Sequence, residues 1–596
     1  MKIFKKKSGH IRLDRKHIAK VYHESADKAG RHFANNFISR LENVHSVRLW
    51  VVEWVLLVVV VFLFAIVQNI WYTESYGTES FGDGGDYTEA VLGDINSMNP
   101  LYASTSAERT LGKLLFANLV SPDMTGSSRG DLAKTVRMND EGTVWTLTLR
   151  DNLRWSDGEP ITADDIIYTI DLIRDPTART TMAVDFSRIK MKKKSNKVVE
   201  FTLPSPYIDF IDTLEFPVLP KHILGETSPA LVYESDFSMN PVGSGPFVLK
   251  SLQVNAPTSL AKKTVFLSRN DNYFLSKTKL KSFTLKTYEK RDDIVSDLNA
   301  SVVTATAELS GESSKGLSNK IEMRKSLLNG GVFAFFNTRS DAVSSRELRQ
   351  AIQKGIDMNE VRAGISEAQY LDFPIIARQE EDLMFPEPIK QDKAAAKELF
   401  GKLEYYYDKK GKLLKKDGTP AILNVVAQKR DNLTAAAERF VGELNKLGFE
   451  ANLTIYDESA ESADFFSAVV RPREFDILLY EVDLGVSADP FVYYSSTQAT
   501  AGGWNFSNYS NSLVDDALLS AHTTTNRSVR KTKYEYFLKA WQNDVPAIAF
   551  YQSAMDYYHV PNVQIYSESV ILTDALDRFV DVRYWATARK TVNITP

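Results

Sequence analysis

The sequence predicts an α/β protein that follows a single transmembrane helix. Fourteen apolar residues run without interruption from Trp54 to Val67, which is typical of a segment that crosses a bilayer. From Tyr87 onward, short strand-like runs alternate with longer stretches of helical periodicity. Residues 421–456 have the pattern strand, helix, strand, which indicates a β-α-β unit and therefore some parallel strands.

The apolar run is long enough to act as an anchor. Leu49–Val52 and Ile70–Tyr72 extend it to the roughly 20 residues that a bilayer requires. Residues 1–48 carry twelve Lys or Arg against four Asp or Glu, and such basic segments stay in the cytoplasm. We therefore expect an uncleaved helix over 49–72, a cytoplasmic N-terminus and an extracytoplasmic body. The alternative, a cleaved signal peptide, is disfavoured because its basic region would be too long and no small-residue cleavage site follows.

The composition excludes several classes of protein. Beyond the anchor the chain has about 500 residues, which is enough for two or three hydrophobic cores. From residue 49 onward the chain has 60 basic and 72 acidic residues. The body therefore lacks the excess of basic residues that nucleic-acid binding requires. The chain has no cysteine, which excludes disulfides, thiolate metal sites and thiol nucleophiles. His222, His522 and His559 are scattered singly, so we predict neither a metal site nor a cofactor.

The first half of the body begins after a linker. Residues 73–86 are rich in Gly, Ser and acidic residues without periodicity. Hydrophobic periodicity then predicts a strand, a helix and a half-buried strand, over residues 88–95, 107–120 and 145–149. Thr162 is placed to cap the next helix, with Asp165 three residues further on, as in a capping box.

The second half continues the alternation of strands and helices. Ser344 or Ser345 is placed to cap one of these helices. The strands are predicted over 247–252, 264–270, 332–338, 421–427 and 451–456, and the helices over 344–361 and 435–447.

An ordered set of stretches resembles the family 5 extracellular solute-binding proteins, which include the oligopeptide- and dipeptide-binding subunits of ABC importers. The most specific stretch is RWSDGEPITADDIIYTI, which lies between a predicted strand and a predicted helix. The family's order is kept from about residue 88 to 585 by further, individually weaker stretches, among them NPLYAST, FANLVSPD, VGSGPFVLK, SRNDNYF, DPFVYYSSTQ and NFSNYSNSLVDDALL.

The resemblance implies a two-lobed periplasmic-binding-protein-like fold with three domains, in which the first domain is split. The expected division is a cytoplasmic basic segment 1–48, a transmembrane helix 49–72, a linker 73–86, a first domain 87–105 with 239–332 and 554–596, a second domain 106–238, and a third domain 333–553.

The function that the resemblance implies is capture of a solute without bond chemistry. We expect a monomeric, membrane-tethered receptor that closes its two lobes around a peptide and delivers it to the permease subunits of an ABC importer. The same fold binding an oligosaccharide or a metal chelate stays open as an alternative.

The resemblance also points to residues that bind the solute. Tyr102 and Ser104 match a family loop that runs beside the ligand backbone. Arg430 matches an arginine that meets the ligand carboxylate, and a guanidinium suits that role because it offers two parallel donors. Tyr480 and Trp504 are expected to line the cleft.

One position departs from the family pattern. Similar proteins pair the peptide ammonium with an aspartate four residues before a proline, and here Val486 stands four residues before Pro490. Asp483 stands where the family has a tryptophan. Either Asp483 takes over the ammonium-binding role from a shifted backbone, or the solute has no ammonium to pair.

Signals for an enzyme are few. Ser276 and Lys279 have the spacing of a Ser/Lys acyltransferase, but accompanying motifs are missing, so we predict no catalytic residues. An anchored hydrolase is therefore the weakest of the alternatives.

Overall fold

Two long strands, β13 (Glu322–Phe336) and β19 (Ala547–His559), pair at the centre of a ten-stranded sheet in the computed structural model. The structure describes residues 48–593 except 124, 182–185, 381 and 458–464. The basic segment 1–47 lies outside the described residues. The strand order of the large sheet is β17-β16-β18-β13-β19-β12-β2-β11-β10-β9.

The large sheet has two ends with different connections. At one end β2 lies parallel to β11, and β9, β10 and β11 form an antiparallel meander. The strands of this end are β2 (Asp86–Leu92), β9 (Phe247–Val254), β10 (Lys263–Arg269), β11 (Ser282–Tyr288) and β12 (Ala305–Thr306). At the other end β16 pairs in parallel with both β17 and β18. Its strands are β16 (Ile422–Gln428), β17 (Glu450–Tyr456) and β18 (Ile477–Asp483).

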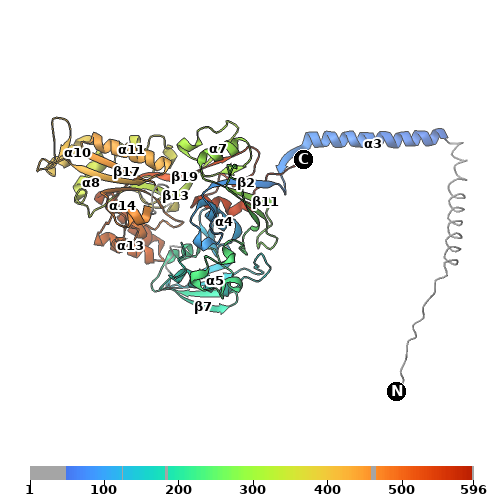
Figure 1. Ribbon diagram of the computed structural model, residues 1–596, viewed down its shortest axis with the longest axis horizontal. Coiled ribbons are helices and arrows are strands. Elements are labelled where there is room, and N and C mark those ends of the chain that lie inside the picture. The colour runs from blue at the N-terminus through green and yellow to red at the C-terminus, as the bar shows by residue number, and fades with distance from the viewer. Residues whose placement is uncertain (1–47, 124, 182–185, 381, 458–464, 594–596) are drawn as a thin grey trace, which may run out of the picture. The chain divides into compact units, whose positions relative to one another are not determined.

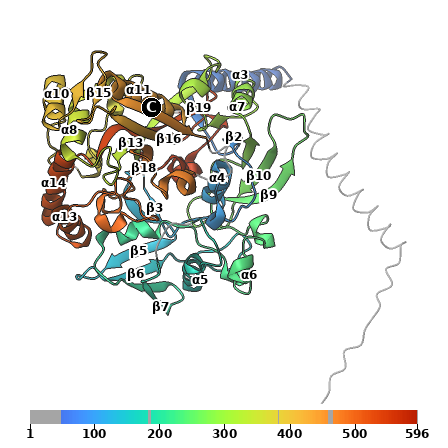
Figure 2. The same cartoon turned by 60° about the vertical axis from the view of Figure 1, so that its left-hand side comes forward.

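A second, four-stranded sheet forms part of the first lobe, with the order β5-β6-β8-β7 (Figures 1 and 2). Helix α5 (Ala163–Arg174) packs its apolar side, including Ile166 and Ile170, into the same core as this sheet. The strands are β5 (Ala133–Met138), β6 (Val144–Leu149), β7 (Lys190–Ser195) and β8 (Val198–Thr202).

Separate hydrophobic cores underlie the two lobes. The first core surrounds the four-stranded sheet and the β2 end of the large sheet, and it includes α4 (Ser106–Leu115). Strand β13 sends alternate side chains into two further cores, because successive residues of a strand point to opposite faces. One of these cores holds helices α8 (Arg346–Gly355), α10 (Lys393–Lys402) and α11 (Asp431–Lys446); the other holds α13 (Ser512–Thr523) and α14 (Arg527–Asp544) (Figure 1).

The remaining elements are short. They comprise the helices α6 (Lys221–Leu224), α7 (Arg291–Asn299), α9 (Met358–Val361) and α12 (Phe491–Tyr494), and the strand pairs β3 (Val120–Pro122) with β4 (Ser128–Gly130) and β14 (Tyr406–Tyr407) with β15 (Leu413–Leu414). Three 3₁₀ helices carry residues that line the cavities described below: η2 (Pro100–Tyr102), η3 (Ile208–Leu214) and η11 (Ala575–Tyr584).

The N-terminal unit is described by itself. Helix α3 (Arg48–Tyr76) contains a 24-residue stretch, Leu49–Tyr72, with a mean hydropathy of 2.9. The most apolar part of this stretch is not buried against any described residue. By length and composition this stretch can cross a membrane. Its apolar side chains are exposed on all sides of the helix, which suits lipid rather than a protein core. In the segment predicted as a linker, α3 continues to Tyr76 and β1 (Gly77–Phe81) pairs with β20 (Arg589–Asn593).

Most predicted elements are confirmed, and two are corrected. The helix predicted over 107–120 ends at Leu115, because Phe116 is extended, and β3 begins at Val120. Thr162 caps α5, and its capping box with Asp165 is present. The β-α-β unit is confirmed as β16, α11 and β17. The helix predicted over 344–361 is wrong as one element: α8, capped by Ser345, ends at Gly355, and a separate α9 follows. The reason is local, because Ile356 is extended and Asp357 caps the new helix.

Candidate functional site

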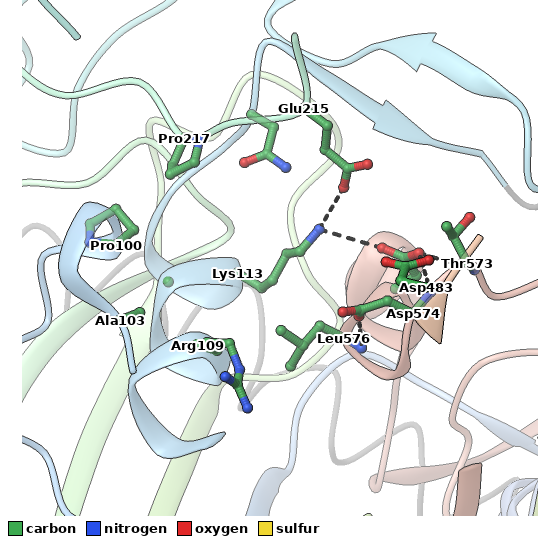
Figure 3. A pocket seen from close by; sticks show the side chains of 13 residues that line it. Pro100, Ala103, Arg109, Lys113, Glu215, Pro217, Asp483, Thr573, Asp574 and Leu576 are labelled. Carbon is green, nitrogen blue, oxygen red and sulfur yellow. Dashed lines mark hydrogen bonds and ion pairs between the residues drawn. The ribbon is translucent and has the colours of Figure 1, made fainter. Parts of the chain in front are cut away.

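The first cavity lies beside the C-terminal end of β18 and has a volume of about 280 Å³ (Figure 3). Charged groups dominate its wall: four carboxylates face two cations. The carboxylates are Glu215, Asp483, Asp574 and Asp577, and the cations are Arg109 and Lys113. Pro100, Ala103, Gly112, Asn118, Pro217, Thr573 and Leu576 complete the lining.

Helix α4 carries both cations of the first cavity, and a strong cap fixes its start. Thr105 and Glu108 form a capping box. The Glu108 carboxylate also accepts hydrogen bonds from the backbone N–H groups of Asn96, Ser97 and Ser104. These bonds hold the preceding loop against the helix, so that Pro100 and Ala103 reach the cavity wall.

Lys113 already has partners among the acids. Its Nζ lies 2.9 Å from Glu215 Oε1 and 3.4 Å from Asp577 Oδ1, and Figure 3 shows the Lys113 side chain pointing toward Glu215. Burial would lower the pKa of Lys113, but the carboxylates of Glu215, Asp577 and Asp574 outweigh it and raise the pKa. Burial raises the pKa of Asp577 to about 6, although Lys113 opposes this shift. Lys113 therefore stays charged and holds two carboxylates.

Among the described residues, two acids of this cavity have no ion pair, Asp483 and Asp574, whereas Glu215 and Asp577 share Lys113. Asp483 Oδ1 accepts a hydrogen bond of 2.8 Å from the N–H of Gly485, and in the described part of the chain no ion pair includes it. The side chain reaches solvent through the cavity, yet protein surrounds it on most sides, and this burial raises its pKa to about 7. The nearby carboxylates of Asp574, Asp577 and Glu215 add to the shift. A cation that entered the cavity would favour the ionised form of Asp483.

The predicted loop residues serve the structure of their own loop. Tyr102 is buried, its ring lies 5.2 Å from that of Tyr233, and its hydroxyl has no hydrogen-bond partner within the described residues. Ser104 donates from Oγ to Glu108 Oε2 at 3.0 Å. Both residues adjoin cavity-lining positions without lining the first cavity themselves, and their role in binding stays a prediction.

Arg430, Tyr480 and Trp504 lie around β18 at a distance from the first cavity's wall. Arg430 precedes α11 and donates from Nη1 to Glu481 Oε2 at 3.0 Å. Tyr480 stacks on Phe465 at 5.6 Å, and both Tyr480 and Trp504 meet the ring of Phe506, at 5.3 and 5.8 Å. The structure thus brings Tyr480 and Trp504 into one aromatic cluster. Their contact with a solute stays a prediction, as does that of Arg430.

A second cavity, of about 370 Å³, lies on the other side of the segment that follows Asp483. Residues of both lobes line it, including Asp209 and Asp212 from η3 and Arg527 and Arg530 from α14. Most of its charged groups are already paired. Arg530 contacts Asp209 and Glu380, and Arg378 donates to Asn329. Asp212 accepts from Ser487. Its electrostatics therefore differ from those of the first cavity, where Asp483 lacks a cation.

Sequence reasoning missed Lys113, Glu215, Asp574 and Asp577. They lie far apart along the chain and carry no motif that links them. Only Asp574 has a local signal, since it caps η11 in a capping box with Asp577. The Ser276/Lys279 spacing has no structural support as a catalytic pair, because Ser276 is exposed and Lys279 Nζ lies 3.4 Å from Gln564 Oε1.

The model of the bacterial extracellular solute-binding proteins, family 5 (middle region), matches residues 128–504, which is more than half of the chain. The chain belongs to family 5. The members are non-enzymatic solute-binding proteins that serve ABC importers, so this family 5 protein is a binding protein rather than a hydrolase. The predicted fold, an α/β periplasmic-binding-protein fold with one apolar N-terminal helix, is confirmed.

Individual relatives are distant but similar over most of their length. The oligopeptide-binding protein AppA of Bacillus subtilis is 23% identical over 484 residues, which cover 78% of this chain and 86% of AppA. The solved structure of AppA from Bacillus subtilis in complex with a nonapeptide has a TM-score of 0.68 and 20% identity, covering 85% of this chain and 100% of that one.

Two further solved structures show that similar folds hold chemically different solutes. NikZ from Campylobacter jejuni in complex with Ni(L-His) has a TM-score of 0.67 and 22% identity, with 84% of this chain and 99% of that chain covered. The periplasmic EDTA-binding protein EppA has a TM-score of 0.70 and 17% identity, with 87% and 99% covered. The fold alone therefore leaves the solute open, and the charges of the cavity must decide it.

Proposed function

We propose that this protein is a membrane-anchored receptor that captures a peptide with a free ammonium group and delivers it to the permease of an ABC importer. The observation that carries the proposal is the Asp483 carboxylate, which lines the first cavity without a cation of its own. An ammonium group is the simplest partner for it, because a carboxylate with a raised pKa gains most from a nearby positive charge.

The charge of the first cavity supports a cationic group over an anionic one. Four carboxylates outnumber two cations, and Lys113 is already held by Glu215 and Asp577. A chelate with a net negative charge, such as a metal complex of EDTA, would meet repulsion here. A peptide carries an ammonium group at its N-terminus, which could pair with a carboxylate of the cavity. Its backbone amides remain available for hydrogen bonds with other groups of the cleft.

Arg430, Tyr480 and Trp504 would bind other parts of the same solute. Arg430 is suited to the carboxylate of a solute, although Glu481 must then share or release it. The aromatic cluster of Tyr480 and Trp504 offers apolar surface for side chains. Capture would follow from closure of the two lobes along the predicted domain division, since contacts made by both lobes favour the closed form.

The anchor completes the proposal. Helix α3 would keep the receptor in the cell membrane, with residues 1–48 in the cytoplasm. A tethered receptor meets its permease at a high effective concentration without any additional contact.

The first test identifies the solute directly. The full-length protein is purified in lipid nanodiscs, and co-purifying small molecules are released and identified by mass spectrometry. Peptides support the proposal, whereas glycans or metal chelates as the main species would replace it with the corresponding alternative.

The second test measures the role of the ammonium group by calorimetry. Peptides with a free N-terminus are compared with their N-acetylated forms, and the wild type with Asp483→Asn. Acetylation and Asp483→Asn should each weaken binding by about 2–5 kcal/mol, the usual effect of stranding one partner of a charge pair. Asp271→Asn, an exposed carboxylate paired with Lys277, is the control and should bind as the wild type. Equal affinity of Asp483→Asn would remove Asp483 from the site.

A further inference from the structure

The second cavity contains a set of direct contacts between the two lobes. Asp209 lies on η3, whose Phe210 and Leu214 belong to the first core. Arg530 lies on α14, whose Tyr534 and Phe537 belong to the core around α13 and α14. An ion pair between Asp209 and Arg530 therefore joins the first core to the core around α13 and α14.

The geometry of this pair is that of a two-pronged guanidinium–carboxylate contact. Arg530 Nη2 lies 2.8 Å from Asp209 Oδ2, and Nη1 donates to Oδ1 at 3.0 Å. The two side chains are only 9% and 12% exposed, and Glu380 Oε1 lies 3.4 Å from Arg530 Nε. Removing one partner of such a shielded pair has a larger effect than breaking a surface ion pair, because the remaining charge is left buried without its counter-ion.

Neighbouring contacts extend the junction. Asp212 Oδ2 accepts a hydrogen bond of 2.5 Å from Ser487 Oγ, and Asp212 also accepts from Ser128. The ring of Tyr207, beside η3, stacks on His522 of α13 at 4.2 Å. Together these contacts connect the 207–212 segment to three separate parts of the other lobe.

None of these residues lines the first cavity. Arg530 has two carboxylate partners within the protein, Asp209 and Glu380, and Asp212 accepts from Ser487, so these contacts form without a solute. A junction of this kind favours the closed arrangement of the lobes in every ligand state. If the closed state is the one that binds tightly, the apparent affinity is the intrinsic affinity multiplied by the fraction of receptor that is closed. A change that lowers this fraction weakens binding in proportion.

We propose that Arg530 is a positioning residue for solute capture: paired with Asp209, it holds the two lobes together and so raises affinity for a solute that it does not touch. The proposal depends on the two-lobed fold and is independent of which solute the first cavity takes.

The test uses the full-length protein in nanodiscs without added solute. Because the chain has no cysteine, spin labels can be placed on Lys192→Cys in β7 and Lys393→Cys in α10, two exposed positions in different lobes. Pulsed electron paramagnetic resonance then reports the distribution of lobe-to-lobe distances. Wild type should show a dominant short distance, and both Arg530→Gln and Asp209→Asn should shift the population to longer distances.

Two further variants separate closure from general damage. Arg527→Gln is the matched control, because Arg527 lies on the same helix and lines the same cavity but is exposed and has no ion pair in the described chain. It should leave the distances unchanged. Arg530→Lys, which keeps the charge but loses the two-pronged contact, should give an intermediate distribution. A partial rescue of this kind is not expected if Arg530 only stabilises its own helix.

Affinity is the second readout. For the tightest synthetic peptide of the calorimetric series, Arg530→Gln should raise the dissociation constant by about tenfold, mainly through faster dissociation, while Arg527→Gln should not. Distance distributions that are the same in wild type, Arg530→Gln and Asp209→Asn, whether all short or all long, would overturn the proposal. Since the distances are measured without a solute, failure to find a peptide ligand would leave this result standing.

Discussion

At the scale of single residues, the first cavity is lined by carboxylates that differ in their partners. Asp577 has Lys113, whereas Asp483 has only a backbone N–H. Burial raises the pKa of both, to about 6 and about 7, so that near neutral pH their charge responds to whatever enters the cavity. A cation beside either carboxylate would favour its ionised form.

Solute binding should therefore depend on pH. Below about pH 7 Asp483 is protonated, and a cation can bind it only if the proton leaves, so affinity should fall by up to about tenfold per pH unit between pH 7 and pH 5. Asp577 lines the same cavity, and its pKa of about 6 places its titration in this range, whereas Lys113 stays charged throughout. Calorimetry at pH 5, 6, 7 and 8 measures the pH dependence, and Asp483→Asn should bind weakly with a flatter profile.

Ionisation of Asp483 should lower the free energy of unfolding of the solute-free protein as the pH rises. A salt-bridged acid, whose pKa is lowered, has the opposite effect. Because the pKa of Asp483 is raised above its unfolded value, ionisation costs free energy in the folded state, and this cost builds up between about pH 4 and pH 7. Asp483→Asn should therefore raise the melting temperature of the solute-free protein at pH 8 but not at pH 4. A lower melting temperature at pH 8 would contradict this account of the shift.

A second residue-scale prediction concerns the buried pair of Arg578 and Glu89. Arg578 Nη2 lies 2.6 Å from Glu89 Oε1, and the side chains are 3% and 0% exposed. Arg578→Met should destabilise the protein by about 3–5 kcal/mol, because it leaves a carboxylate buried without its cation. Denaturant titration measures the loss. Lys134→Met, which breaks an exposed pair with Asp151, should change stability by about 0–1 kcal/mol.

At the scale of elements, helix caps place the functional segments. Thr105 and Glu108 start α4, which carries Arg109 and Lys113 to the cavity. Strand β18 ends at Asp483, which pairs in register with Gly330 of β13. An added Cβ at Gly330 would lie 2.9 Å from Ser553 Oγ, so glycine permits the close approach of β13 and β19 beside the site.

The cap of α5 gives a prediction at this scale. Thr162→Ala removes the side-chain acceptor for the Asp164 N–H and should destabilise the protein by about 1 kcal/mol. Thr532→Ala is the control. Thr532 lies within α14, away from its ends, and its side chain is exposed, so alanine is the better helix former there. Thermal unfolding of both variants measures the difference, and equal losses would argue against a specific capping effect.

At the scale of the whole molecule, the apolar helix α3 can cross a membrane, and an uncleaved helix would distinguish this chain from a freely diffusing receptor. If residues 49–72 remain uncleaved, the protein in cells should keep its N-terminus and should resist extraction from membranes by alkaline carbonate. Mass spectrometry of the N-terminal peptide decides the point. A protein that begins after residue 72 and is released by carbonate would show that the apolar stretch is a signal peptide.

Much of the architecture could be predicted from the sequence because the signals are local. Thr162 and Asp165 are three residues apart, and the alternation in Trp145, Leu147 and Leu149 follows directly from strand geometry. The family's ordered stretches then supplied the fold, and the match over residues 128–504 confirms membership of the family. One exception, the break between α8 and α9, depends on two extended residues, Ile356 and Asp357, which helical periodicity does not report.

The sequence by itself determined the apolar helix, the succession of strands and helices, and membership of a solute-binding family. Only the tertiary structure decided which charges meet: Lys113 and Asp577 are 464 residues apart, and Asp209 and Arg530 are 321 apart. The physical reason is that periodicity and capping act between neighbours along the chain, whereas the energy of a charge depends on what surrounds it in space. Asp483 was visible as a candidate residue, but its lack of a cation became visible only when the chain was folded around it.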